Sequence, residues 1–88
     1  MQKSPEYVEN IKNELFKHNR ISRIETPENS ELMITCLVDS IQCTARLTVS
    51  RIVNKFGNHI IKSTSAGSKF MGSTLVKIYW ESKNDNKL

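Results

Sequence analysis

The strictest alternation of apolar and polar residues along the chain lies at residues 41–49. Every odd-numbered residue there is apolar and every even-numbered residue is polar, a period of two that fits a β-strand and not a helix. The preceding stretch, residues 32–38, alternates as well, although Met33 and Leu37 make its second face less polar. Both stretches are therefore predicted to be strands.

A tight turn at Asp39 and Ser40 would pair these two strands so that apolar residues face apolar residues along the whole ladder. A shift by one residue would place apolar side chains opposite polar ones, so the pattern fixes the register. Cys36 and Cys43 would then be cross-strand neighbours on the buried face. We expect them to be reduced thiols that pack as small hydrophobic side chains, without a redox or metal-binding role.

Two helices are predicted from apolar residues at helical spacing. The first runs from Pro5 to about Asn19, with Ser4 as its N-cap and proline at its first position. Its apolar stripe consists of Val8, Ile11 and Leu15, widened by Tyr7 and Phe16. The second helix is short and runs from Arg51 to about Phe56, with Ser50 as its N-cap and Gly57 and Asn58 at its end.

Three further extended segments complete the predicted sheet. They are a short strand at residues 21–25, a segment that opens at Ile60, and a last strand at residues 74–80. The last strand has two faces, one with Val76, Ile78 and Trp80 and the other with Leu75, Lys77 and Tyr79. The expected order is helix, three strands, helix, two strands (αβββαββ). This order predicts an α+β fold, a small antiparallel or mixed sheet of four to five strands with both helices on one face.

The length and composition fit one folded domain. All 88 residues are assigned to it, with a short flexible N-terminus at residues 1–3 and a polar tail at residues 82–88. The N-terminus lacks the apolar run of a signal peptide, and no apolar run approaches the roughly 18 residues of a membrane-spanning helix. We expect a cytoplasmic protein that does not bind membranes, or one in the host cytoplasm if the source is viral.

The charge is distributed unevenly along the chain. Residues 1–40 hold five basic and seven acidic side chains, whereas residues 41–80 contain no Asp or Glu. The cationic residues of that second stretch are Arg46, Arg51, Lys55, Lys62, Lys69 and Lys77. If they gather on one surface, they present an unneutralised positive field.

This field predicts a non-catalytic nucleic-acid-binding protein, with RNA slightly favoured over DNA. In the predicted strands, Arg46, Lys77 and Tyr79 point away from the main apolar stripes and would share one open sheet face. Basic, hydrogen-bonding and aromatic groups on one surface are what single-stranded nucleic acid requires. The predicted binding residues are therefore the six cations named above together with Tyr79.

Other functions stay open at this point. The basic surface could instead dock on an acidic protein, as expected of a small regulator or inhibitor from a phage or mobile element. The segment from Thr44 to Gly57, which contains the string TVSRIVNK, resembles in texture the recognition helix of a helix-turn-helix repressor. Residues Ile60 to Trp80 would then be a wing hairpin, and the protein a winged-helix DNA-binding regulator. Exposed sheet edges would also allow two copies to pair into a homodimer.

No residue set predicts an enzyme, a cofactor or a bound metal. Residues 67–74 share the glycine spacing of a phosphate-binding loop, but Ser73 stands where that loop needs lysine, and a strand is predicted to follow. His18 and His59 have no ligand or nucleophile partner at a recognisable spacing. We expect both histidines to be surface or boundary residues.

Overall fold

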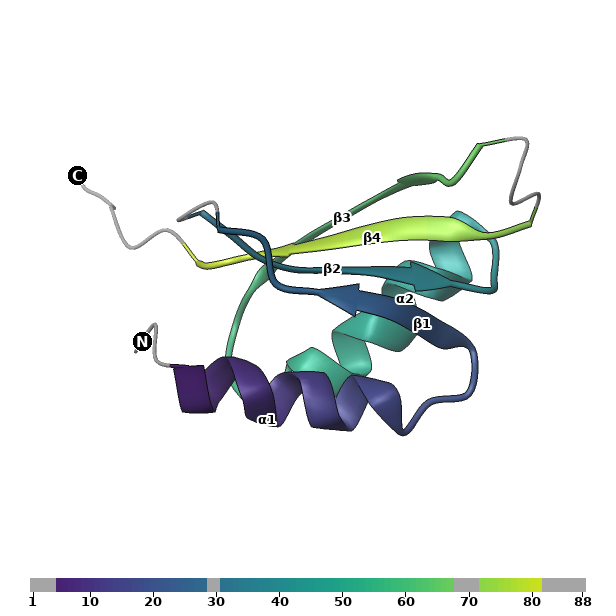
Figure 1. Ribbon diagram of the computed structural model, residues 1–88. Coiled ribbons are helices and arrows are strands. Elements are labelled where there is room, and N and C mark those ends of the chain that lie inside the picture. The colour runs from purple at the N-terminus through teal and green to yellow at the C-terminus, as the bar shows by residue number, and fades with distance from the viewer. Residues whose placement is uncertain (1–4, 29–30, 68–71, 82–88) are drawn as a thin grey trace.

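The computed structural model of the protein describes residues 5–28, 31–67 and 72–81. These residues form an α+β fold of two helices and a four-stranded antiparallel sheet, which confirms the predicted fold class (Figure 1). The elements are α1 (Pro5–Phe16), β1 (Ile21–Glu25), β2 (Leu32–Val38), α2 (Gln42–Val53), β3 (Ile60–Ser65) and β4 (Thr74–Tyr79). The chain ends predicted to be flexible, 1–3 and 82–88, lie outside the described residues.

The strands are arranged in the order β1-β2-β4-β3, and all neighbours are antiparallel. Each helix is followed by an edge strand and then by a central strand, so the chain contains the unit αββ twice. The two units meet at the central pair β2 and β4. This repeat of topology has no counterpart in the amino-acid sequence, where no internal repeat is visible.

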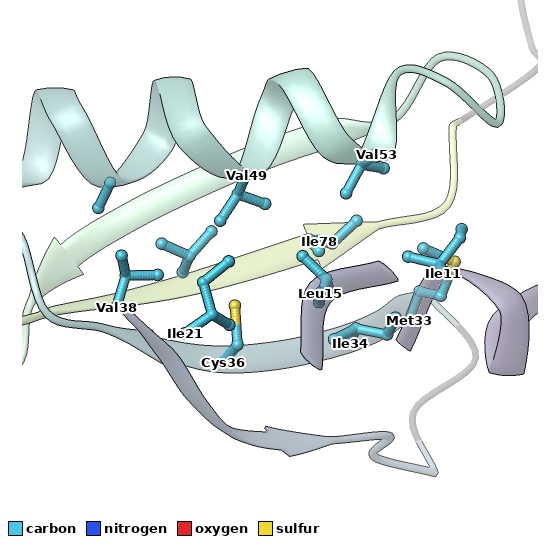
Figure 2. Packing of buried hydrophobic residues seen from close by; sticks show 12 residues of the cluster. Ile11, Leu15, Ile21, Met33, Ile34, Cys36, Val38, Val49, Val53 and Ile78 are labelled. Atoms are coloured by element: carbon cyan, nitrogen blue, oxygen red, sulfur yellow. The ribbon is translucent and has the colours of Figure 1, made fainter. Parts of the chain in front are cut away.

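Both helices lie on the same side of the sheet, as predicted (Figure 1). The hydrophobic core fills the space between the helices and this face of the sheet, as Figure 2 shows. Its fully buried members include Ile11 and Leu15 of α1, Val49 and Val53 of α2, and Ile78 of β4. The opposite face of the sheet is covered by neither helix.

The first helix is close to its prediction. It begins at Pro5 and ends at Phe16, about a turn earlier than the expected end near Asn19. The backbone tightens directly after it, because the amide of Lys17 donates to the carbonyl of Glu14 and that of His18 to Leu15. The predicted cap, Ser4, lies outside the described residues.

The strand predicted at residues 41–49 is wrong, because these residues belong to α2. Ala45, Val49 and Val53 are fully buried at a spacing of four residues, as on one face of a helix. Ala45 and Val49 fit a strand pattern and a helix pattern equally well. The helix pattern alone continues past Ser50, and it leaves Leu47 exposed at 52% and Ile41 at 63%. Residues 51–53 of the helix predicted at 51–56 are therefore the end of a longer helix, and residues 54–56 lie beyond it.

The predicted hairpin between residues 32–38 and 41–49 is consequently wrong as well. Asp39 and Ser40 connect β2 to α2, and the hydroxyl of Thr74 donates to the Ser40 carbonyl at 2.7 Å. The central partner of β2 is β4 instead. Cys36 is buried in the sheet as expected, but Cys43 is exposed on α2, so the two cysteines are not cross-strand neighbours.

Candidate nucleic-acid interface

The cationic residues of the carboxylate-free stretch fall into two groups. Arg46 and Arg51 are exposed on α2, and Lys55 is exposed directly after it, on the helical side of the molecule. Lys62 and Lys77 lie on β3 and β4. The prediction that Arg46 and Lys77 share one sheet face is therefore wrong, because residue 46 is helical. Lys69 lies outside the described residues.

Lys77 and Tyr79 do lie on the uncovered side of the sheet. In β4, Thr74, Val76 and Ile78 are buried and alternate with half-buried Leu75, Lys77 and Tyr79, as the period-two pattern predicts. Residues directly opposite on neighbouring strands share a face. The register therefore defines the open face as Ser22, Glu25, Leu32, Thr35, Leu37, Ile60, Lys62, Thr64, Leu75, Lys77 and Tyr79.

Two lysines sit side by side on this open face. Lys62 and Lys77 are direct cross-strand partners, and Thr35 is the partner of Lys77 on the other side. Like charges directly opposite each other destabilise a sheet. Such a pair on an uncovered face therefore favours a role in binding an anion.

Tyr79 adds an aromatic ring at one end of the open face, next to the two lysines. The ammonium group of Lys62 lies 5.3 Å from the centre of the Tyr79 ring, within the range of a cation–π contact. Tyr79 is paired with Ile60, whose side chain is 41% exposed. The open face thus presents two cations, an aromatic ring and an exposed apolar side chain next to one another.

The other end of the open face is hollowed. A shallow pocket of about 310 Å³ lies over the sheet there. It is lined by Arg23, Glu25, Thr35, Leu37, Ser65, Ala66 and Leu75. Leu37 and Leu75 are cross-strand partners of the central pair and give the hollow an apolar floor.

Arg23 adopts an unusual backbone conformation at the rim of this hollow. Its φ angle is +51°, in the left-handed region, and the pairing of β1 with β2 shifts register between Ser22 and Glu25. A β-bulge of this kind redirects a side chain and bends its strand. A non-glycine residue held at positive φ costs on the order of 1 kcal/mol, and such strain clusters at functional sites.

The second group of cations, on the helical side, is partly offset by an acid from α1. The pKa of Glu14 is lowered, mainly because Lys17 donates a hydrogen bond to its carboxylate at 2.9 Å. The charge of Lys55 contributes in the same direction, which places it near Glu14. Lys55 is therefore a poorer candidate for a phosphate contact than Lys62 or Lys77.

The two histidines have structural partners. His59 Nε2 lies 3.0 Å from the Tyr7 hydroxyl, and His59 Nδ1 lies 3.0 Å from the Gly57 carbonyl oxygen. The Tyr7 hydroxyl also donates a hydrogen bond to the Phe56 carbonyl at 2.8 Å. The Tyr7 ring stacks on the Trp80 ring, with 5.8 Å between the ring centres. This cluster ties the start of α1 to the ends of α2 and β4. At His18, Nδ1 accepts a bond from the Arg20 amide at 3.3 Å.

Within residues 5–28, 31–67 and 72–81, no three His, Cys, Asp or Glu side chains gather as metal ligands. The strand expected after the glycine-bearing loop is β4, which begins at Thr74. No helix in the described ranges is long and apolar enough to cross a membrane.

Of the residues on the open face and around its hollow, the sequence analysis names Lys62, Lys77 and Tyr79 as candidates and does not name Arg23, Glu25 or Thr35. Thr35 could have been found, because it alternates with the buried residues of β2. Arg23 and Glu25 depend on a bulge that no residue pattern indicates. Comparisons with protein-family models, with curated proteins and with solved structures found no match for this chain.

Proposed function

We propose that the protein is a non-catalytic binder of single-stranded nucleic acid and that the open face of its sheet is the binding surface. The observation that carries the proposal is the juxtaposition of Lys62, Lys77 and Tyr79 on a face that neither helix covers. Lysines neutralise phosphates, and an aromatic ring offers a platform on which any base can stack. A base that stacks on Tyr79 would displace the Lys62 ammonium from the ring toward the neighbouring phosphate.

A flat sheet face suits a single strand better than a duplex. Duplex DNA is read by an element that enters a groove, and a strand with splayed bases is read by stacking and by hydrogen bonds to base edges. The winged-helix alternative loses its main support in this fold. α2 is preceded by β2 and not by a helix, so the two helices do not form a helix-turn-helix.

The test is a salt titration with a labelled single-stranded RNA or DNA of about ten nucleotides, a length within the usual site size of such proteins. We expect affinity to fall as salt rises, with a log–log slope of roughly −0.7 for each phosphate contact. The double variant Lys62→Ala/Lys77→Ala should bind more weakly and reduce the steepness of that slope by about 1.4, which corresponds to two lost contacts.

The matched control is Arg46→Ala/Arg51→Ala, which removes the same charge from the helical side. It should change the slope by much less, because these residues lie on the other face of the molecule. Equal effects of the two double variants, or affinity that does not depend on salt, would contradict the proposal. Parallel titrations of RNA and DNA strands decide between the two, and we propose RNA ahead of DNA.

A protein partner is the second candidate, and the surface of α2 favours it. Leu47 is 52% exposed and lies beside Arg46, with Arg51 one turn further along the helix. An exposed apolar side chain among cations fits an acidic protein surface. Recovery of one protein at stoichiometric level, resistant to nuclease and lost in Arg46→Ala/Arg51→Ala, would support this candidate over nucleic acid. Pairing into a homodimer through β1 or β3 stays a prediction.

A further inference from the structure

The hollow at the end of the open face has the dimensions and lining of a site for one flat ring system. Its volume of about 310 Å³ is at the lower end of the range for small-ligand pockets. Leu37 and Leu75 form an apolar floor in the middle of the sheet. Polar residues surround this floor: Arg23 and Glu25 on the side of β1, and Ser65 on the side of β3.

We infer that this hollow binds a guanine base of the single strand that the open face holds. The inference rests on the proposed function and names the base that the strand would place here. A purine ring laid on Leu37 and Leu75 covers their apolar surface. Its edges then meet the charged groups at the rim, where Glu25 accepts hydrogen bonds and Arg23 donates them.

The pairing of a carboxylate with a guanidinium selects guanine by its pattern of donors and acceptors. Guanine carries two neighbouring donors, N1–H and the N2 amino group, which the two oxygens of the Glu25 carboxylate can accept together. On its other edges, O6 and N7 accept the fork of N–H groups that arginine presents. Thr35, the cross-strand partner of Glu25, also lines the hollow and supplies a hydroxyl there.

The other bases fit this lining less well. Adenine presents the acceptor N1 beside its amino group, so a carboxylate would face a lone pair. In uracil, two carbonyl oxygens flank the single N–H and repel a carboxylate in the same way. Cytosine offers one amino group but has the acceptor N3 next to it, and its single ring covers less of the floor.

The bulge in β1 explains how both charged residues reach the hollow. In a regular strand, Arg23 would point to the opposite face from Ser22, toward the helices. The positive φ of Arg23 and the shift of register between Ser22 and Glu25 bring both Arg23 and Glu25 to the lining of the same hollow. The strained backbone therefore has a role that packing alone does not give it.

The experiment compares a uridine decamer with the same strand carrying one guanosine, adenosine or cytidine at its centre. Binding is measured for the wild type, Glu25→Gln and the control Glu9→Gln, which removes an exposed charge from α1. We expect the wild type to bind the guanosine strand about tenfold more tightly than the uridine strand, since one bidentate base contact provides discrimination of that order. Glu25→Gln should lose this preference while its affinity for the uridine strand stays the same or rises. Glu9→Gln should keep it.

Equal affinity of the wild type for all four strands would overturn the guanine site and leave the proposed function standing. A preference for guanosine that persists in Glu25→Gln would overturn the site at this hollow. Absence of salt-dependent binding to every one of these RNA strands and to the corresponding DNA strands would instead remove the proposed function, and the guanine site with it.

Discussion

Lys62 and Lys77 are direct cross-strand partners in the middle of an uncovered sheet face. Their ammonium groups repel each other, and Lys62 also contacts the Tyr79 ring at 5.3 Å. The pair is therefore expected to lower the stability of the sheet, and it places two positive charges next to each other on the open face. A conflict between stability and charge of this kind is common at binding sites.

Replacement of Lys77 by threonine should stabilise the fold and weaken nucleic-acid binding. Removal of a like-charge pair on opposed strands is expected to raise the free energy of unfolding by about 0.5 kcal/mol at low salt. Urea denaturation measures this change. Near 1 M salt the part of the gain that comes from charge should disappear, because screening acts over about 3 Å there. Lys62→Thr is the comparison and should gain less, since it also loses the contact with Tyr79. A variant that is less stable than the wild type at low salt would contradict this account.

The fold class and most element boundaries could be predicted from the sequence, because alternation and helical spacing record which face of an element is buried. β1, β2 and β4 agree with their predictions to within a residue. The strand prediction for residues 41–49 was wrong because Ala45 and Val49 fit the period of a strand and the period of a helix equally well. Two features outside this stretch favour the helix. Val53 continues the buried helical face, and β2 pairs with β4, which leaves residues 41–49 without a place beside β2 in the sheet.

Paired substitutions in α2 test the corrected assignment. In a strand, Leu47 and Val49 would share a buried face, whereas in the helix Val49 is fully buried and Leu47 is 52% exposed. Val49→Ala should therefore lower the free energy of unfolding by about 2 kcal/mol through the cavity that it leaves. Leu47→Ala should change it by less than about 0.5 kcal/mol. Chemical denaturation of both variants gives the answer, and similar large losses in the two would restore the strand.

The cysteines provide a second test of the same correction. Burial raises the pKa of the Cys36 thiol to about 12, so it carries almost no reactive thiolate at neutral pH. Cys43 is exposed on α2. In the native protein, a thiol reagent should modify Cys43 quickly and leave Cys36 unreacted, and both should react in denaturant. Mass spectrometry after a short labelling pulse identifies the modified residue. Protection of Cys43 in the native state would be inconsistent with its position here.

The candidate site was less accessible to sequence reasoning than the fold. A strand pattern assigns Lys77 and Tyr79 to a face, but it does not say which cations from distant segments reach that face. Arg46 was predicted on the sheet but lies on α2. Arg23 lines the hollow because of the bulge in β1. The first outcome goes with the pairing of β2 and β4, which are far apart in the sequence, and the second with an irregular pairing of β1 and β2.

The network around His59 predicts how stability depends on pH. The pKa of His59 is lowered, because burial disfavours the charged ring by more than the Gly57 carbonyl and the nearby charge of Glu81 favour it. The unfolded chain therefore binds a proton more readily than the folded one. The contribution of His59 to stability is fully present above the ordinary histidine pKa of about 6.5 and is lost as the pH falls through the lower folded value.

Thermal unfolding followed between about pH 8 and pH 5 measures this dependence. The wild type should lose stability over that interval, and His59→Gln should lose less, because glutamine does not titrate. The substitution also breaks the contact with the Tyr7 hydroxyl, so His59→Gln should be less stable than the wild type at pH 8. His18→Gln is the comparison, since it replaces a histidine that lies at the other end of α1, outside this network. If His59→Gln retained the full loss of stability toward pH 5, the titrating group would have to lie elsewhere in the chain.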